Sequence, residues 1–96
     1  MDLKKERKKI DQLDALIITS ITKRIKIAAS IKDWRKTEGL PRTDQKREQE
    51  ILANSKRLAR HHGTSPFLAA MIIKKIIAEG KRSHKFKNPK NEPNQK

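Results

Sequence analysis

Three arginines occupy positions where a long helix should bury apolar side chains. Between Lys4 and Lys36 no glycine or proline interrupts the chain. Apolar residues recur there at steps of three and four, as on one face of a helix. This stripe comprises Arg7, Ile10, Asp14, Ile17, Ile21, Arg24, Ala28, Ile31 and Arg35. A guanidinium keeps its proton and is costly to bury alone, so an anion must meet Arg7, Arg24 and Arg35.

That anion has two possible sources. Asp14, Asp44 or Glu48 could pair with Arg7 and Arg24 across helices, and Arg7 could instead lie on the surface near a fraying helix end. Alternatively, the helical core binds an anionic ligand. We favour the ligand, because a two-fold dimer would double the guanidiniums at the seam and exceed the acids available at core-facing positions.

Two further groups of residues have a spacing that suits a site. Asp44 and Glu48 lie four residues apart, on one helical face, with Arg47 beside them. Taken alone, these three residues are better explained by a helix cap followed by an ordinary i,i+4 charge pattern. Gly80 and His84 are also four apart on an apolar face, where a glycine usually has a packing reason. No metal-ligand spacing, phosphate loop or Ser-His-Asp arrangement is seen, so we expect neither metal nor cofactor.

The charge of the chain is extreme. Its 96 residues include 25 Lys and Arg against 11 Asp and Glu, a net charge of +14. Such a charge implies an anionic partner, either nucleic acid, an acidic membrane or a small metabolite. The absence of cysteine excludes disulfides and thiolate metal sites. Apolar runs such as residues 67–73 are too short to span a bilayer, so we expect a cytoplasmic protein without a membrane partner.

The sequence predicts an all-α fold of three helices, at about residues 3–36, 44–61 and 66–84. Gly39 and Pro41 end the first helix, and Thr43 or Asp44 caps the second. Gly63 ends the second helix, and Thr64-Ser65-Pro66 begins the third. The helical domain then covers residues 1–84. Residues 85–96 form a basic tail that is predicted to be disordered.

The first helix is too long for a compact monomer. It would extend about 50 Å, whereas a 96-residue globule has a radius of gyration of about 12 Å. A continuous apolar seam of this length favours a second chain, so we predict a homodimer that forms an intertwined helical bundle. The core-facing positions of the two shorter helices are predicted to be Glu48, Ile51, Ser55, Leu58 and His62, then Ala70, Ile73, Ile77, Gly80 and His84.

The order and spacing of the charged residues along the chain resemble those of the all-helical class of chorismate mutase. The resemblance covers residues 3–84 and rests on Arg7, Ile10, Asp11, Asp14, Arg24, Arg35, Asp44, Arg47 and Glu48, with the segments 46–52 and 76–79. It implies a long helix with two shorter ones, in two intertwined chains that share their active sites. It also implies an isomerase of aromatic amino acid biosynthesis in the shikimate pathway, which rearranges chorismate, a dianion, to prephenate without a cofactor.

The resemblance also implies a role for each site residue. Arg7 of one subunit and Arg24 of the other would clamp the two carboxylates. Arg35 stands where the family has a lysine that contacts a carboxylate and the ether oxygen. Asp44 and Glu48 would bind the ring hydroxyl and order the site. The substrate-binding set is Arg7, Arg24, Arg35, Asp44, Arg47, Glu48, Gly80 and His84, of which Arg35, Glu48 and His84 are the predicted catalytic residues.

Three of these positions depart from the family pattern, the first being Arg35 in place of the lysine. Gly80 replaces a serine that many members use to bind a carboxylate. His84 replaces a glutamine that donates to the ether oxygen, and a histidine can donate as well. Together with Arg35, these changes leave open a related enzyme acting on isochorismate or aminodeoxychorismate.

A non-enzymatic alternative is a basic helical protein that binds nucleic acid, which the net charge of +14 would favour. This is the less favoured interpretation, because only Trp34, Phe67 and Phe86 could stack on bases. The arginines also lie on the stripe that should be buried instead of an open face.

Overall fold

The computed structural model describes residues 1–82, and these form three α-helices. The helices are α1 (Leu3–Thr37), α2 (Gln45–His61) and α3 (Pro66–Arg82). No strand occurs among these residues, so the predicted all-α fold with three helices is confirmed. The last two residues of the predicted third helix and the tail at 85–96 lie outside the described residues.

Helix α1 is long because nothing within it stops helical hydrogen bonding. Asp2 caps its start, accepting a hydrogen bond from the backbone N–H of Lys5 at 3.1 Å. The helix ends at Thr37, and Gly39 follows its C-cap with a φ of 72°, in the left-handed region that favours glycine. The 35 residues between give a rod about 52 Å long.

The predicted caps of the shorter helices are also present. Asp44 caps α2 by accepting a hydrogen bond from the backbone N–H of Arg47 at 3.0 Å. Gly63 has a φ of 76° and follows α2. Ser65 Oγ accepts from the backbone N–H of Leu68 at 3.1 Å, directly before Pro66 opens α3. Local sequence therefore accounts for both ends of α2 and for the start of α3.

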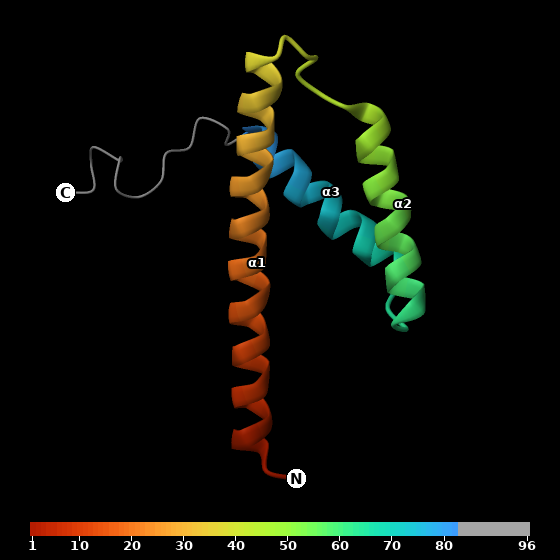
Figure 1. Ribbon diagram of the computed structural model, residues 1–96. Coiled ribbons are helices and arrows are strands. Elements are labelled where there is room, and N and C mark those ends of the chain that lie inside the picture. The colour runs from red at the N-terminus through yellow and green to blue at the C-terminus, as the bar shows by residue number, and fades with distance from the viewer. Residues whose placement is uncertain (83–96) are drawn as a thin grey trace, which may run out of the picture.

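The three helices form a flat frame (Figure 1). Helix α2 runs in the direction opposite to α1, and α3 crosses from the far end of α2 towards the C-terminal half of α1. Helix α3 packs against both other helices. The frame measures 56 × 41 × 15 Å, so it is about one helix thick. A single layer of helices cannot enclose side chains from all sides, and the buried core of the described chain consists of Ala59 and Ala70.

The core-facing positions of α2 differ in part from those predicted. Glu48, Ile51 and Ser55 are half-buried as expected. Leu58 and His62 are exposed, however, and Ala59 is buried in their place. The chain turns back at Gly63. Helix α3 then packs on the face of α2 that contains Ala59 and not on the face that contains Leu58. In α3 the predicted stripe holds over the described residues, because Ala70 is buried and Ile73, Ile77 and Gly80 are half-buried.

The arginine stripe of α1 is divided between two environments. Its C-terminal part contains the half-buried Ile21, Arg24, Ala28 and Arg35, although Ile31 is exposed. All residues from 7 to 20 are exposed. Large apolar side chains here include Ile10, Leu13, Leu16, Ile17 and Ile18, each between 54% and 61% exposed. Within one chain, the N-terminal half of α1 thus presents an uncovered apolar surface. The predicted two-chain bundle remains a prediction.

Candidate active site

A pocket of about 570 Å³ lies between the three helices and the loop that joins α1 to α2. Six of the eight predicted substrate-binding residues line it: Arg24, Arg35, Asp44, Arg47, Glu48 and Gly80. They come from the C-terminal half of α1, the first turn of α2 and the end of α3. The structure therefore brings together residues that lie up to 56 positions apart in sequence, counted from Arg24 to Gly80.

Apolar side chains form the remainder of the pocket wall. Helix α1 contributes Ile25, Ile27, Ala28 and Ile31, α2 contributes Ile51, and α3 contributes Ile76 and Ile77. A ligand here would thus meet hydrocarbon surface and charge at once. Such a lining suits a small molecule with an apolar body and ionised substituents.

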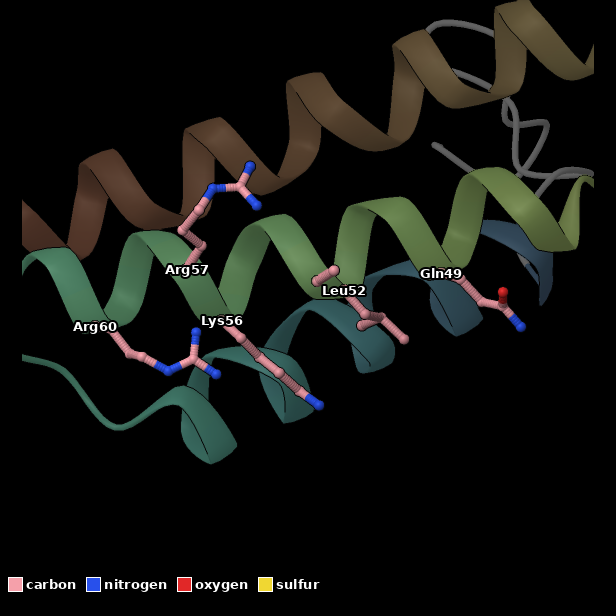
Figure 2. Close-up of a pocket in the computed structure, with 6 residues that line it drawn as sticks. Gln49, Leu52, Lys56, Arg57 and Arg60 are labelled. Carbon is pink, nitrogen blue, oxygen red and sulfur yellow. The ribbon is translucent and has the colours of Figure 1, made fainter.

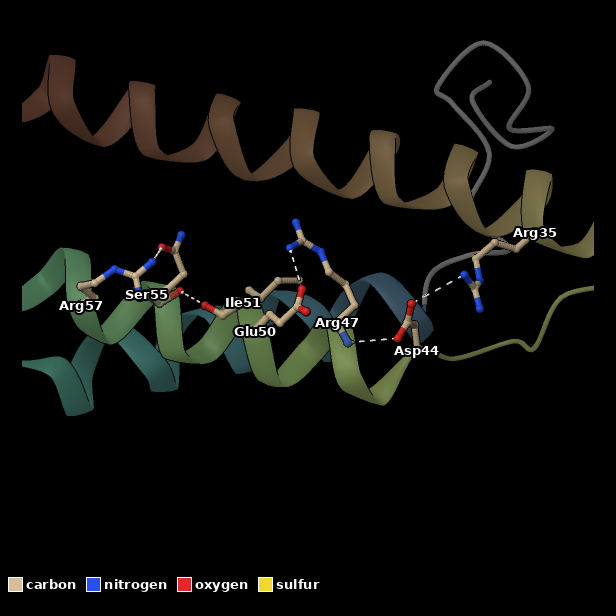
Figure 3. Close-up of polar contacts among 8 residues, drawn as sticks. Arg35, Asp44, Arg47, Glu50, Ile51, Ser55 and Arg57 are labelled. Atoms are coloured by element: carbon tan, nitrogen blue, oxygen red, sulfur yellow. Dashed lines mark hydrogen bonds and ion pairs between the residues drawn. The ribbon is translucent and has the colours of Figure 1, made fainter.

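Arg35 is held in place by the loop and by α2. Its Nε donates to the carbonyl oxygen of Pro41 at 3.1 Å, and its Nη1 lies 3.7 Å from Oδ2 of Asp44 (Figure 3). The other oxygen of Asp44 accepts the capping hydrogen bond from Arg47. The carboxylate of Asp44 therefore links the start of α2 to the end of α1. The side chain of Arg35 is only 21% exposed, so its guanidinium is oriented before any ligand arrives.

Glu48 forms an ion pair with a lysine of another helix. Its Oε2 lies 2.8 Å from Nζ of Lys81 on α3, and its side chain is 29% exposed. Lys81 was not among the predicted site residues. The periodicity of a single helix does not reveal this pair, because the pair depends on the position along α2 at which α3 packs.

Arg24 and Arg47 differ in the exposure of their side chains and in their partners. Arg47 is 64% exposed at the side chain and pairs with Glu50 at 3.4 Å (Figure 3). Arg24 is half-buried, and its guanidinium makes no hydrogen bond or ion pair with any residue of the described chain. The acids suggested as its partners are distributed otherwise, since Asp44 meets Arg35 and Glu48 meets Lys81. Arg24 is thus available to an external anion.

The lining carries a large excess of positive charge. Seven basic residues face two acidic ones, a net charge of +5: Lys23, Arg24, Lys32, Arg35, Arg42, Arg47 and Lys81 against Asp44 and Glu48. Sequence reasoning had identified three of the seven. Lys23 and Lys32 flank the arginine stripe, and Arg42 lies in the loop, where helical periodicity gives no signal. A pocket with this balance attracts anions with more than one charge.

Two predicted residues are not part of the pocket. Arg7 is exposed and lies 17 positions before Arg24 on the same straight helix, about 25 Å away along its axis. Its side chain makes no hydrogen bond or ion pair with the residues at 1–82. The position of His84 lies outside the described residues.

A second groove of about 460 Å³ lies on the outer face of α2 (Figure 2). It is lined by Gln49, Leu52, Ala53, Lys56, Arg57 and Arg60. All six belong to one helix, and none is a predicted site residue. Arg57 is engaged by Asn54 of the same helix (Figure 3). This groove adds to the basic surface without bringing helices together.

Residues 1–82 contain neither a metal-binding cluster nor a membrane-spanning helix. No group of three or more His, Cys, Asp or Glu residues there could hold a metal ion. No helix there has the length and apolar character that a membrane span requires.

Comparison with known proteins gives one match. Residues 6–85 match the family model described as chorismate mutase type II. The matched range includes all eight predicted substrate-binding residues. No curated protein and no solved structure matches the chain.

Proposed function

Because this chain belongs to the chorismate mutase type II family, we propose that it is an isomerase that converts chorismate to prephenate. The carrying observation is the pocket between the three helices, where Arg24, Arg35, Asp44, Arg47 and Glu48 meet an apolar wall. Its lining has a net charge of +5, and chorismate is a dianion with an apolar ring. The proposed step belongs to phenylalanine and tyrosine biosynthesis.

The proposed chemistry needs no nucleophile. Chorismate rearranges through a chair-like pericyclic transition state, in which an ether C–O bond breaks as a new C–C bond forms. Negative charge grows on the ether oxygen as this happens. The protein must hold both carboxylates in a compact conformer and place fixed donors at that oxygen. Orientation and preorganised electrostatics then supply the rate enhancement.

Each pocket residue has a role that fits its surroundings. Arg24 has no partner within the described chain and would take a carboxylate through its planar fork. Arg35 is already oriented by Pro41 and Asp44, which suits a donor to the ether oxygen. Glu48 would accept a hydrogen bond from the ring hydroxyl. His84, one helical turn beyond Gly80 in the predicted third helix, is proposed as a second donor to the ether oxygen.

We also propose that two copies of the chain complete each site. Arg7 cannot reach the pocket of its own chain, because about 25 Å of straight helix separates it from Arg24. The exposed apolar side chains of residues 10–18 would be covered by a second copy. In that arrangement the N-terminal half of one α1 brings Arg7 to the pocket of its partner, where it clamps the second carboxylate.

The direct test is turnover of chorismate by the purified protein. We expect chorismate absorbance to fall and prephenate to appear as the product, identified by chromatography. Isochorismate and aminodeoxychorismate serve as parallel substrates. The related-enzyme alternative is favoured by Gly80, where a methyl group would meet nothing within 4 Å, so the pocket has room for an altered substituent. Turnover of either compound with none of chorismate would reject the proposed substrate.

A further inference from the structure

The ion pair between Lys81 and Glu48 joins two helices inside the pocket. Lys81 lies near the end of α3, and Glu48 lies in the first turn of α2. Nζ and Oε2 are 2.8 Å apart, a distance typical of a charge-assisted hydrogen bond. Both residues line the pocket. The family resemblance gives Glu48 a role in the site and says nothing of Lys81.

Among the residues at 1–82, Lys81 is the cation in contact with Glu48. The neighbouring arginines are engaged elsewhere, since Arg35 meets Asp44 and Arg47 meets Glu50. Each of the two acids in the pocket thus has its own cation, supplied by a different helix. A glutamate on a helix has three rotatable side-chain bonds, and an anchor from another element removes most of that freedom.

We propose that Lys81 is a positioning residue, which fixes one oxygen of Glu48 so that the other is directed at the ring hydroxyl of the substrate. This inference rests on the proposed function. A lysine ammonium has three N–H donors, so it can hold the carboxylate without occupying both oxygens. Glu48 is thereby oriented before the ligand binds, which lowers the cost of ordering it in the transition state.

The pair contributes little to folding, and this makes the role testable. The two side chains are 43% and 29% exposed, and partly exposed ion pairs typically stabilise by about 0–1 kcal/mol. Removing Lys81 should therefore leave the fold intact. A loss of activity would then report on the site.

The experiment is a double-mutant cycle with a matched control. Lys81→Gln should lower kcat/KM for chorismate about tenfold, mostly in kcat, whereas Lys81→Arg should stay within about threefold of wild type, because it keeps the charge and the donors. Glu48→Gln should lower kcat/KM further. The double variant should be no worse than Glu48→Gln alone, since Lys81 acts through that carboxylate. The control is Lys74→Gln, an exposed lysine two turns earlier on the same face of α3, which should leave kcat/KM unchanged.

Other outcomes would overturn the inference. Additive losses in the double variant would show that Lys81 acts on the substrate or the overall field, not through Glu48. Unchanged kinetics of Lys81→Gln would show that the ion pair has no part in turnover. An equal loss in Lys74→Gln would show a general effect of surface charge. Absence of turnover by the wild type would reject the proposed function and this role together, whereas an active wild type separates the two questions.

Discussion

At the scale of single residues, Arg24 is the strongest candidate for binding a carboxylate of the ligand. It is half-buried in the pocket without a partner in the described chain. We expect Arg24→Ala to lower kcat/KM for chorismate by a factor of about 30 to 1,000, because a charge-assisted contact in a closed site is worth about 2–4 kcal/mol. Helical content should not change, since no side-chain hydrogen bond or ion pair with the described residues is lost. Steady-state kinetics and circular dichroism provide the two measurements.

Lys26 is the matched control for this change. It is exposed, lies two residues further along α1 and does not line the pocket. Lys26→Ala removes the same charge from the protein and should retain wild-type kcat/KM. If both variants lost activity equally, net charge and not the Arg24 contact would explain the effect.

Gly80 offers a change that adds an interaction. A Cβ atom at this position would meet nothing within 4 Å, and the residue lines the pocket. Gly80→Ala should stabilise the helix by about 0.5–1 kcal/mol, because glycine is a poor helix former. Gly80→Ser should in addition place a hydroxyl donor at the pocket wall and lower KM for chorismate. Thermal unfolding and kinetics of both variants separate the two effects. Equal KM values would show that the hydroxyl does not reach the substrate.

Residue types and spacing brought out several of the charged residues that line the pocket, because those residues follow helical periodicity. Arg24 and Arg35 share a stripe of α1, and Asp44, Arg47 and Glu48 share one turn of α2. Lys81 and Arg42 escaped prediction for a physical reason. Lys81 acquires its partner only when α3 docks on α2, and Arg42 lies in a loop without periodicity.

At the scale of elements, two N-caps allow structure and function to be separated. Asp44 caps α2 and also pairs with Arg35, whereas Ser65 caps α3 outside the pocket. We expect Asp44→Ser to keep the cap and stability within about 0.5 kcal/mol, yet to lower kcat/KM because the carboxylate is lost. Ser65→Ala should cost about 1 kcal/mol of stability with kcat/KM unchanged. Urea unfolding and kinetics test both. If Asp44→Ser kept wild-type kcat/KM and lost stability instead, Asp44 would lie outside the catalytic machinery.

Helix boundaries were predictable because caps are local, whereas packing faces were only partly so. Asp44, Gly63 and Ser65 act on their own neighbouring backbone. The face of α2 that is covered depends on the direction in which α3 packs back after the turn at Gly63. This choice placed Ala59 in the core and left Leu58 51% exposed.

For the whole molecule, the proposed sharing of sites makes two impaired variants complementary. Arg7→Ala and Arg24→Ala should each retain at most about 3% of wild-type activity alone, which corresponds to a loss of about 2 kcal/mol or more. A heterodimer of the two contains one site that lacks both arginines and one site that lacks neither. Mixing equal amounts with subunit exchange should therefore recover up to about a quarter of wild-type activity, from random pairing into half heterodimers with one intact site each. Exchange shown by mass spectrometry without any recovery would contradict the shared site.

The single-layer frame has a consequence for how the protein responds to dilution. With only Ala59 and Ala70 buried, the described chain by itself has almost no core to resist unfolding. Under the proposed pairing, the apolar surface of α1 is covered by association, so losing the partner means losing the fold. The melting temperature should then rise with protein concentration, because folding follows mass action. Protein abundance, rather than an intrinsic stability of the chain, would set the fraction that is folded.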